Sequence, residues 1–119
     1  MTPSDLRELV DYNYWARDRI FEAVAVLTPE QYQAAEGAGA RFVVSPGASP
    51  ALLDAAASSP VPFLPGAATA SEVMRLLEHG YRCLKFFPAE PAGGLAYLQA
   101  LAAPLPAARF CPTGGIDAE

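Results

Sequence analysis

Hydrophobic residues recur at helical spacing along the first part of the chain and form one broad apolar stripe, made of Leu6, Leu9, Val10, Ala16, Ile20, Ala23, Val24 and Leu27. This spacing predicts an amphipathic helix over residues 3–27. Residues 2–5 supply an N-cap, a proline at the first helical position and an acidic residue in the first turn. A second, short helix is expected to open at Thr28, because Thr28 and Gln31 have the spacing of a capping box, and to end at Gly37.

After residue 40 the pattern changes to short apolar runs that alternate with helical patches. The runs predict strands within residues 41–47, 61–66, 81–88 and 108–115. Helices are predicted at about residues 49–57, 69–79 and 95–103, between these strands. Strands and helices that alternate at these lengths are typical of βαβ units, so we expect an α/β fold with four parallel strands after the long first helix.

Each predicted strand ends in a loop of small residues that contains a proline, and these loops are SPG, LPGAAT, FFPAE and CPTGG. The carboxyl ends of parallel strands meet at one edge of a sheet, where ligands bind in such folds. Lys85 lies near that edge within an apolar run. A charged residue at such a position is either a solvated lysine at the rim or a reactive amine, and the pattern alone leaves both interpretations open.

Composition narrows the classes of partner. The formal net charge is −5 and the basic residues are scattered, so we expect no nucleic-acid partner. The chain has no apolar run long enough for a membrane span and no signal-peptide pattern, which favours a cytoplasmic protein without a membrane partner. Cys83 and Cys111 have no metal-ligand spacing, and we interpret them as reduced core thiols. No cofactor or metal is predicted.

The second part of the chain carries a family likeness. The stretches ARFVVSPG, VPFLPGAATASEVM, CLKFFPAEPAGG and RFCPTGGI resemble, in this order and spacing, the middle of the 2-keto-3-deoxy-6-phosphogluconate aldolase family. The resemblance covers residues 35–116. It implies class I aldolase chemistry on a (β/α)8 barrel, of which these residues correspond to the fourth to seventh strands.

The resemblance also implies roles for individual residues. Lys85 corresponds to the Schiff-base lysine, and Phe86 and Phe87 beside it favour a neutral amine by desolvating it. The loop of Thr113, Gly114 and Gly115, with Pro112 and Phe87 beside it, corresponds to the substrate and phosphate site, whose ligand is a pyruvate-like keto acid. The sequence does not decide between this role and a frayed chain end for residues 113–115.

Two departures from the family pattern stand out. A barrel of this type needs about 200 residues or more, whereas this chain has 119. The family's general acid/base glutamate lies on an early strand that no segment of this chain resembles, and Glu90 belongs to the KFFPAE motif and does not replace it.

The first 34 residues do not resemble the aldolase family but are similar to the opening helix of DinB/YfiT-like four-helix-bundle proteins. That family binds a metal through several histidines, whereas this chain has only His79, so no metal site is expected. The composition changes at the same place, because glycine first appears at residue 37.

From these likenesses we predict a single domain over residues 1–119, in which a DinB-like segment (1–34) is fused to an aldolase-like fragment (35–119). The predicted fold is a half-barrel whose uncovered apolar surface is shielded by helix 3–27. The predicted function is that of an artificial or recombined chimera without an evolved activity, and the alternative is a residual class I aldolase that works through Lys85. Open sheet edges favour a homodimer or a higher oligomer.

Overall fold

The structure is a computed structural model that describes residues 23–115. Parallel strands alternate with helices along this part of the chain, which confirms the predicted α/β class. The elements, in chain order, are β1 (Ala23–Ala25), α2 (Pro29–Gly37), β2 (Phe42–Val44), α3 (Pro50–Ala57), β3 (Phe63–Leu64), β4 (Gly66–Ala67), α4 (Ala70–Glu78), β5 (Cys83–Phe86), α5 (Ala89–Ala92), α6 (Gly94–Ala102) and β6 (Arg109–Pro112).

Hydroxyl side chains begin three of these helices where the sequence predicts them. The Thr28 hydroxyl accepts a hydrogen bond from the backbone N–H of Gln31, and the Gln31 side chain accepts one from the backbone N–H of Thr28. The predicted capping box is therefore confirmed. Ser49 caps α3 and Thr69 caps α4, each by accepting a hydrogen bond from the backbone N–H three residues further on. These caps satisfy N–H groups that have no partner within the helix.

The strands lie in chain order, each beside the strand before it, as β1-β2-β3 and β4-β5-β6, and all pairs are parallel. Pro65 separates β3 from β4. The Pro65 carbonyl accepts a hydrogen bond from the backbone N–H of Lys85 at 2.9 Å, and the Leu64 carbonyl accepts one from Ser45 at 3.3 Å. One extended segment, residues 63–67, thus borders β2 on one side and β5 on the other and joins the two sheets.

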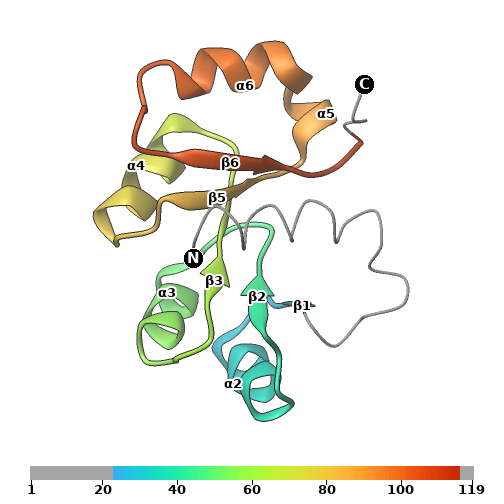
Figure 1. Cartoon of the computed structure of the whole chain (residues 1–119), viewed down its shortest axis with the longest axis vertical. Coiled ribbons are helices and arrows are strands. Elements are labelled where there is room, and N and C mark those ends of the chain that lie inside the picture. The colour runs from blue at the N-terminus through green and yellow to red at the C-terminus, as the bar shows by residue number, and fades with distance from the viewer. Residues whose placement is uncertain (1–22, 116–119) are drawn as a thin grey trace.

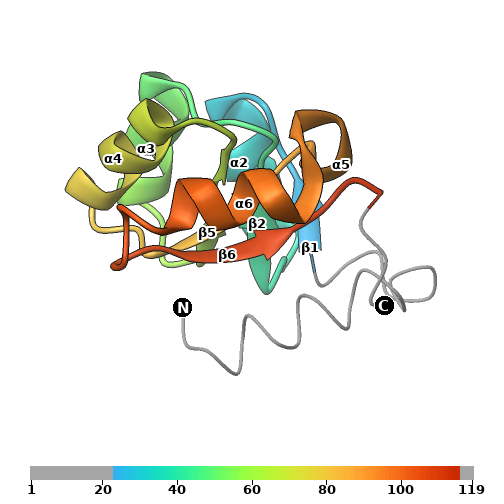
Figure 2. The ribbon, with the colours of Figure 1, turned by 90° about the horizontal axis from the view of Figure 1, so that it is seen from above.

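Helices cover one face of the strands. A right-handed crossover between each pair of neighbouring parallel strands places successive helices on the same side, and Figures 1 and 2 show α2, α3, α4 and α6 arranged around the outside of the strands. The main core lies between them. Its buried members include Val43, Phe63, Leu84 and Phe86 from the strands and Tyr32, Leu52, Val73 and Leu76 from the helices.

The opposite face of the strands has a smaller cluster, which we call the cysteine face. Leu64, Cys83 and Cys111 are buried there, and Phe42 and Val44 pack against them. These residues alternate along their strands with the members of the main core, as side chains on a pleated sheet must. By the same alternation Lys85 lies on the cysteine face, two residues after Cys83.

The predicted helix over residues 3–27 is wrong at its described end, because Ala23–Ala25 is strand β1. Val24 and Val26 are β-branched residues at alternating positions, and β1 pairs with Phe42–Val44 in parallel. The Val26 N–H continues the ladder to the Val44 carbonyl at 2.9 Å. Residues 3–22 of the predicted helix, and its shielding role, lie outside the described residues.

The predicted count of four strands is also wrong. The described residues contain six strands, because β1 was assigned to a helix and the predicted strand 61–66 is divided at Pro65. Pro65 has no N–H to donate, so it interrupts the ladder. The short helix α5 was missed as well, since Pro91 stands inside it and the sequence offers no capping side chain at its start.

Candidate functional site

Lys85 lies in the middle of the sheet and on its cysteine face. Strand β5 places it between Gly66 on β4 and Cys111 on β6, which are its Cα partners in the two ladders. Its side chain is half-buried. Lys85 is the only lysine in the 119 residues, so every observation on a lysine amine in this chain concerns this position.

Burial controls the charge of this amine. Desolvation lowers the pKa of Lys85 from the ordinary 10.5, and the charge interaction with Cys111 opposes part of this effect. Desolvation in turn raises the pKa of Cys111, while Lys85 lowers it and Cys83 raises it. A lysine with a lowered pKa has a larger neutral fraction near pH 7, and the neutral amine is the nucleophile.

The two phenylalanines after Lys85 divide between the faces of the sheet, as the alternation predicts. Phe86 is fully buried in the main core, where its ring stacks on Tyr97 of α6 at 5.7 Å between centroids. The Phe87 ring lies on the other side, with the Lys85 Nζ 4.7 Å from its centroid. Phe87 therefore forms one wall around the amine.

The loop after β6 is held against the start of α5. The backbone N–H of Thr113 donates to the Phe86 carbonyl at 2.9 Å, and the Thr113 carbonyl accepts from Ala89 at 2.8 Å. The Gly114 carbonyl accepts from Glu90 at 2.9 Å. Both Gly114 and Gly115 have positive φ (99° and 87°), which favours glycine. These bonds hold Thr113 and Gly114 in place and bring the loop beside the end of the strand that carries Lys85.

One side chain of this loop has a spare hydrogen-bonding group. The Thr113 Oγ1 is buried, and it has no hydrogen-bond partner in the described part of the chain. A buried hydroxyl without a partner is rare in folded proteins. It is therefore available to a ligand at the carboxyl ends of β5 and β6. Pro112, the last residue of β6, pairs with Phe86 and precedes this hydroxyl.

Sequence reasoning missed two residues beside Lys85. A Cβ atom at Gly66 would lie 2.2 Å from the Pro46 carbonyl oxygen and 2.5 Å from that of Ser45, so only glycine fits where the end of β2 approaches β4. Cys111 is indeed a buried, reduced thiol, as predicted, but its pairing with Lys85 depends on the register of β5 and β6. No signal in the sequence gives that register directly.

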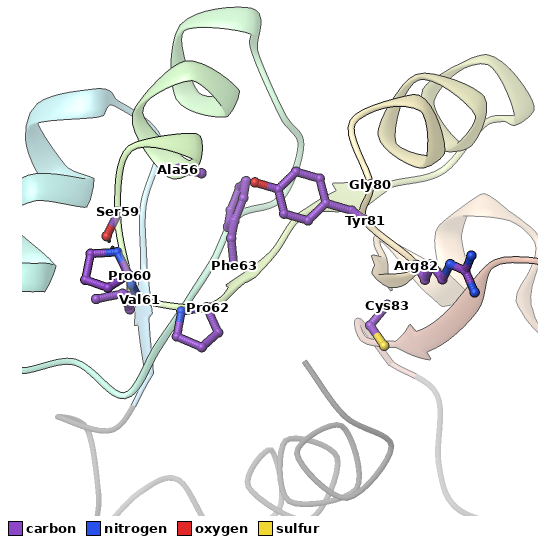
Figure 3. A pocket seen from close by; sticks show the side chains of 10 residues that line it. All are labelled: Ala56, Ser59, Pro60, Val61, Pro62, Phe63, Gly80, Tyr81, Arg82 and Cys83. Atoms are coloured by element: carbon purple, nitrogen blue, oxygen red, sulfur yellow. Dashed lines mark hydrogen bonds between the residues drawn. The ribbon is translucent and has the colours of Figure 1, made fainter.

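A separate pocket of about 370 Å³ lies at the amino ends of the strands. Figure 3 shows the rings of Phe63 and Tyr81 meeting edge to face, while the Arg82 side chain extends away from both. Burial raises the pKa of Tyr81. Lys85 and residues 113–115 do not line this pocket, so it is distinct from the site at the carboxyl ends; its lining residues are Ala56, Ser59, Pro60, Val61, Pro62, Phe63, Gly80, Tyr81, Arg82 and Cys83.

His79 lies away from the site as the C-cap of α4, where it is exposed and its Nδ1 is 2.8 Å from the Arg75 carbonyl. Among residues 23–115, no three His, Cys, Asp or Glu side chains are grouped so that they could hold a metal ion. Within the same residues, every helix is too short or too polar to cross a membrane.

Comparison with known proteins gives one consistent result. The chain matches the family model described as KDPG and KHG aldolase over residues 10–119. It is 55% identical over 95 residues to the 2-dehydro-3-deoxy-phosphogluconate aldolase of Pseudomonas aeruginosa. The aligned residues make up 80% of this chain and 43% of the relative. It is 46% identical over 100 residues to the KHG/KDPG aldolase of Escherichia coli K12. The aligned residues make up 84% of this chain and 47% of the relative.

Solved structures agree with the sequence matches. The KDPG aldolase of Legionella pneumophila, with pyruvate captured as a covalent carbinolamine intermediate, has a TM-score of 0.78 and 42% identity, over 98% of this chain and 57% of that one. The enzyme of Zymomonas mobilis ZM4 with 3-phosphoglycerate has a TM-score of 0.76 and 42% identity, over 79% of this chain and 45% of that one. The chain spans less than half the length of the curated relatives it matches.

These findings overturn the predicted chimera without an evolved activity. Identities of 46% and 55% over at least four-fifths of the chain are those of an aldolase relative, and they favour the alternative interpretation, a class I aldolase. The family match also begins at residue 10, well before the predicted junction at residue 35. The comparisons show no DinB-like helix, and residues 1–22 of that segment lie outside the described residues.

Proposed function

The chain belongs to the KDPG and KHG aldolase family, and we propose on this basis that it carries the imine-forming half of a class I aldolase site, with Lys85 as the Schiff-base residue. The observation that carries this proposal is the placement of the chain's only lysine, half-buried beside Phe87 and Cys111, with a lowered pKa. The activity is that of a carbon–carbon lyase acting on 2-keto-3-deoxy-6-phosphogluconate or a similar keto acid.

The chemistry follows from the neutral amine. Its lone pair attacks the keto carbon of the substrate to give a carbinolamine, which loses water to form an imine. The protonated imine withdraws electrons, so the bond between C3 and C4 breaks with its electron pair moving toward the imine. A base takes the proton of the C4 hydroxyl, and the fragment that begins at C4 leaves as an aldehyde. The remaining enamine is protonated at C3, and water hydrolyses the resulting imine to pyruvate and the free amine. The carbinolamine captured in the Legionella neighbour supports this first step.

The loop after β6 is proposed to hold the ends of the substrate. The buried Thr113 hydroxyl donates to an oxygen of the ligand, since it has no partner among the described residues. Gly114 and Gly115 let the backbone approach an anionic group closely. Pro112 and Phe87 form the apolar boundary of the same region.

The described strands are proposed to be consecutive strands of a (β/α)8 barrel. Their parallel pairing in chain order, with helices on the outside, supports this architecture. The resemblance places the general acid/base glutamate on an early strand that this chain does not match. We therefore expect imine formation to be the step that this chain performs by itself, and cleavage to need a carboxylate from further barrel strands.

Self-association is proposed for the same fold. A 34%-identical neighbour is a cage designed by fusing symmetric oligomeric domains, with a TM-score of 0.69. Light scattering of the purified chain should give the mass of a dimer or a larger assembly, and a monomer mass would contradict this proposal.

Borohydride reduction with pyruvate tests the catalytic proposal. A reducible imine at Lys85 should become a stable adduct that raises the intact mass by one reduced pyruvate unit. Lys85→Met removes the only lysine and leaves the N-terminal amine as an internal control for nonspecific reaction. Equal adduct in the native chain and in Lys85→Met would contradict the assignment.

A further inference from the structure

Two tyrosine hydroxyls each join a helix to a loop of the sheet, at opposite ends of the strands. The Tyr32 hydroxyl of α2 donates to the Val61 carbonyl at 2.7 Å, before β3 begins. The Tyr97 hydroxyl of α6 donates to the Ala68 carbonyl at 2.5 Å, directly after β4 ends. Both bonds have the same chemistry and join residues that are 29 positions apart. The second one lies at the carboxyl ends of the strands, on the side of the proposed site.

The ring of Tyr97 makes another contact, with the strand that carries Lys85. It stacks on the Phe86 ring, with the centroids 5.7 Å apart and the ring planes 11° from parallel. Phe86 stands between Lys85 and Phe87 in the sequence. One side chain of α6 therefore holds β5 through its ring and the loop after β4 through its hydroxyl.

The ladder between β4 and β5 is weak where the loop begins. Strand β4 has only two residues. The Lys85 N–H donates to the Pro65 carbonyl at 2.9 Å, whereas the Phe87 N–H donates to the Ala67 carbonyl at 3.4 Å, which is long for a hydrogen bond of this type. Ala68 follows this long bond directly. The tyrosine hydroxyl thus holds the chain at the point where the ladder ends.

Other local features support this attachment. A Cβ atom at Gly93 would lie 2.6 Å from the Tyr97 Cβ, so only glycine lets the start of α6 lie this close to the tyrosine. Gly93 also has a positive φ of 134°, which favours glycine. On the other side of the bond, the Ala68 N–H donates to the Glu72 carboxylate at 3.2 Å. Both backbone polar groups of Ala68 are therefore bonded to side chains.

We propose that Tyr97 is a positioning residue for imine formation: its hydroxyl holds the end of β4 against β5 and so keeps Phe87 and the Lys85 amine in place for attack on a keto acid. This inference rests on the proposed function of Lys85. The Phe87 ring centroid is 4.7 Å from the amine, and the Phe87 N–H is the group bonded to Ala67. A shift of the loop after β4 is therefore passed on to a wall of the site. A displacement of about 1 Å can change the rate of a reaction by about a hundredfold.

Tyr97→Phe tests this role, because it removes one oxygen atom and keeps the ring that stacks on Phe86. Each chain is mixed with pyruvate and quenched with borohydride after increasing times, and the intact mass gives the fraction of adduct. The saturating rate of adduct formation should fall about tenfold, because the amine is less well placed. The pyruvate concentration that gives half of that rate should stay close to the native value, because Tyr97 lies on the helix-covered face. A loss of stability alone would not produce this split in a folded chain.

Tyr32→Phe is the matched control, because it removes the same kind of bond at the amino ends of the strands. Each variant loses one hydrogen bond between a side chain and a carbonyl, so both should lower the midpoint of urea unfolding by a similar amount. Tyr32→Phe should nevertheless form the adduct at the native rate. A native rate in Tyr97→Phe, or an equal fall in both variants, would overturn the inference.

Amide hydrogen exchange gives a second readout that needs no pyruvate. In Tyr97→Phe the Phe87 N–H should exchange faster relative to the Lys85 N–H, because its long bond to Ala67 lies next to the lost attachment. Tyr32→Phe should leave this ratio unchanged. An unchanged ratio in Tyr97→Phe would show that the hydroxyl does not hold the end of β4, and it would overturn the inference.

The two proposals fail in different ways. If the native chain forms no adduct at Lys85, the imine assignment is wrong and the positioning role of Tyr97 falls with it. If the native chain and Tyr97→Phe form the adduct at Lys85 equally fast, the imine assignment stands and only the role of Tyr97 is wrong. Circular dichroism of each variant checks that the compared chains are folded.

Discussion

The two faces of the sheet are made from the same strands but have different contents. The face under the helices is filled by large apolar side chains such as Leu84 and Phe86, which are completely buried. The cysteine face alternates with it and carries Lys85, a small thiol at Cys111 and no side chain at Gly66. One strand can therefore contribute buried apolar side chains to the core on one face and a reactive amine on the other, because successive side chains point to opposite faces of the sheet.

The largest effect is expected from breaking the helix-covered face at Phe86. Phe86→Ala removes a fully buried ring that stacks on Tyr97, and it should lower the free energy of unfolding by about 3–5 kcal/mol. Phe87→Ala, one residue on, should destabilise the chain much less, since Phe87 is only half-buried. Urea unfolding of the two variants measures this contrast. Equal losses of unfolding free energy in the two variants would show that Phe86 and Phe87 do not lie on a buried and a half-buried face of the sheet.

The next effect concerns the close approach of β2 and β4. Gly66→Ala places a Cβ 2.2 Å from the Pro46 carbonyl oxygen, and the shift it forces should destabilise the fold by about 3 kcal/mol. Gly47→Ala is the matched control, because nothing lies within 4 Å of its Cβ position. Thermal unfolding should separate the two variants clearly, and similar midpoints would argue against this contact.

A smaller effect is expected at the caps that hold the helices over the main core. Thr69→Ala removes the hydroxyl that accepts from the Glu72 N–H at the start of α4, and it should cost about 1 kcal/mol of stability. Ser71→Ala, at an exposed position of the same helix, should change stability by less than half as much in the same unfolding assay. A larger loss from Ser71→Ala would contradict the assignment of the cap.

The smallest effect is pH-dependent and concerns Lys85 on the cysteine face. Its pKa is lowered in the folded chain, so between the folded and unfolded values the unfolded state binds more protons and stability rises with pH. Lys85→Met removes this dependence. The variant should be slightly more stable than the native chain at about pH 7, and the difference should shrink toward about pH 10 as the unfolded lysine also loses its proton. A difference that grows with pH would contradict the lowered pKa.

Much of the fold could be predicted from local signals in the sequence. The caps at Thr28, Ser49 and Thr69 act over three or four residues, so the sequence contains all that they need. The apolar runs around Phe42 and Leu84 predicted their strands for the same reason. Strand β1 was missed because its alternating valines follow directly on a stripe with helical spacing, and only pairing with β2 decides between the two structures.

The site was predictable only in part. Lys85 was identified because a charged residue in an apolar run is conspicuous and because the motif around it resembles that of a known family. The partnership with Cys111 and the close approach at Gly66 depend on register and on contacts between distant segments, which neighbouring residues do not encode. The chimeric interpretation was wrong because it depended on a DinB-like resemblance of residues 1–34 and on the change of composition at residue 37, whereas the aldolase family match begins at residue 10.

The assignment of Lys85 as the imine-forming residue is tested most sharply by locating the pyruvate adduct by tryptic mapping after borohydride reduction. Trypsin cuts after Arg82, Lys85 and Arg109, and a modified lysine resists cleavage. If Lys85 forms the imine, an uncut peptide of residues 83–109 should carry one reduced pyruvate unit and should appear only when pyruvate is present. Complete cleavage after Lys85, with the adduct confined to the N-terminal peptide, would contradict it.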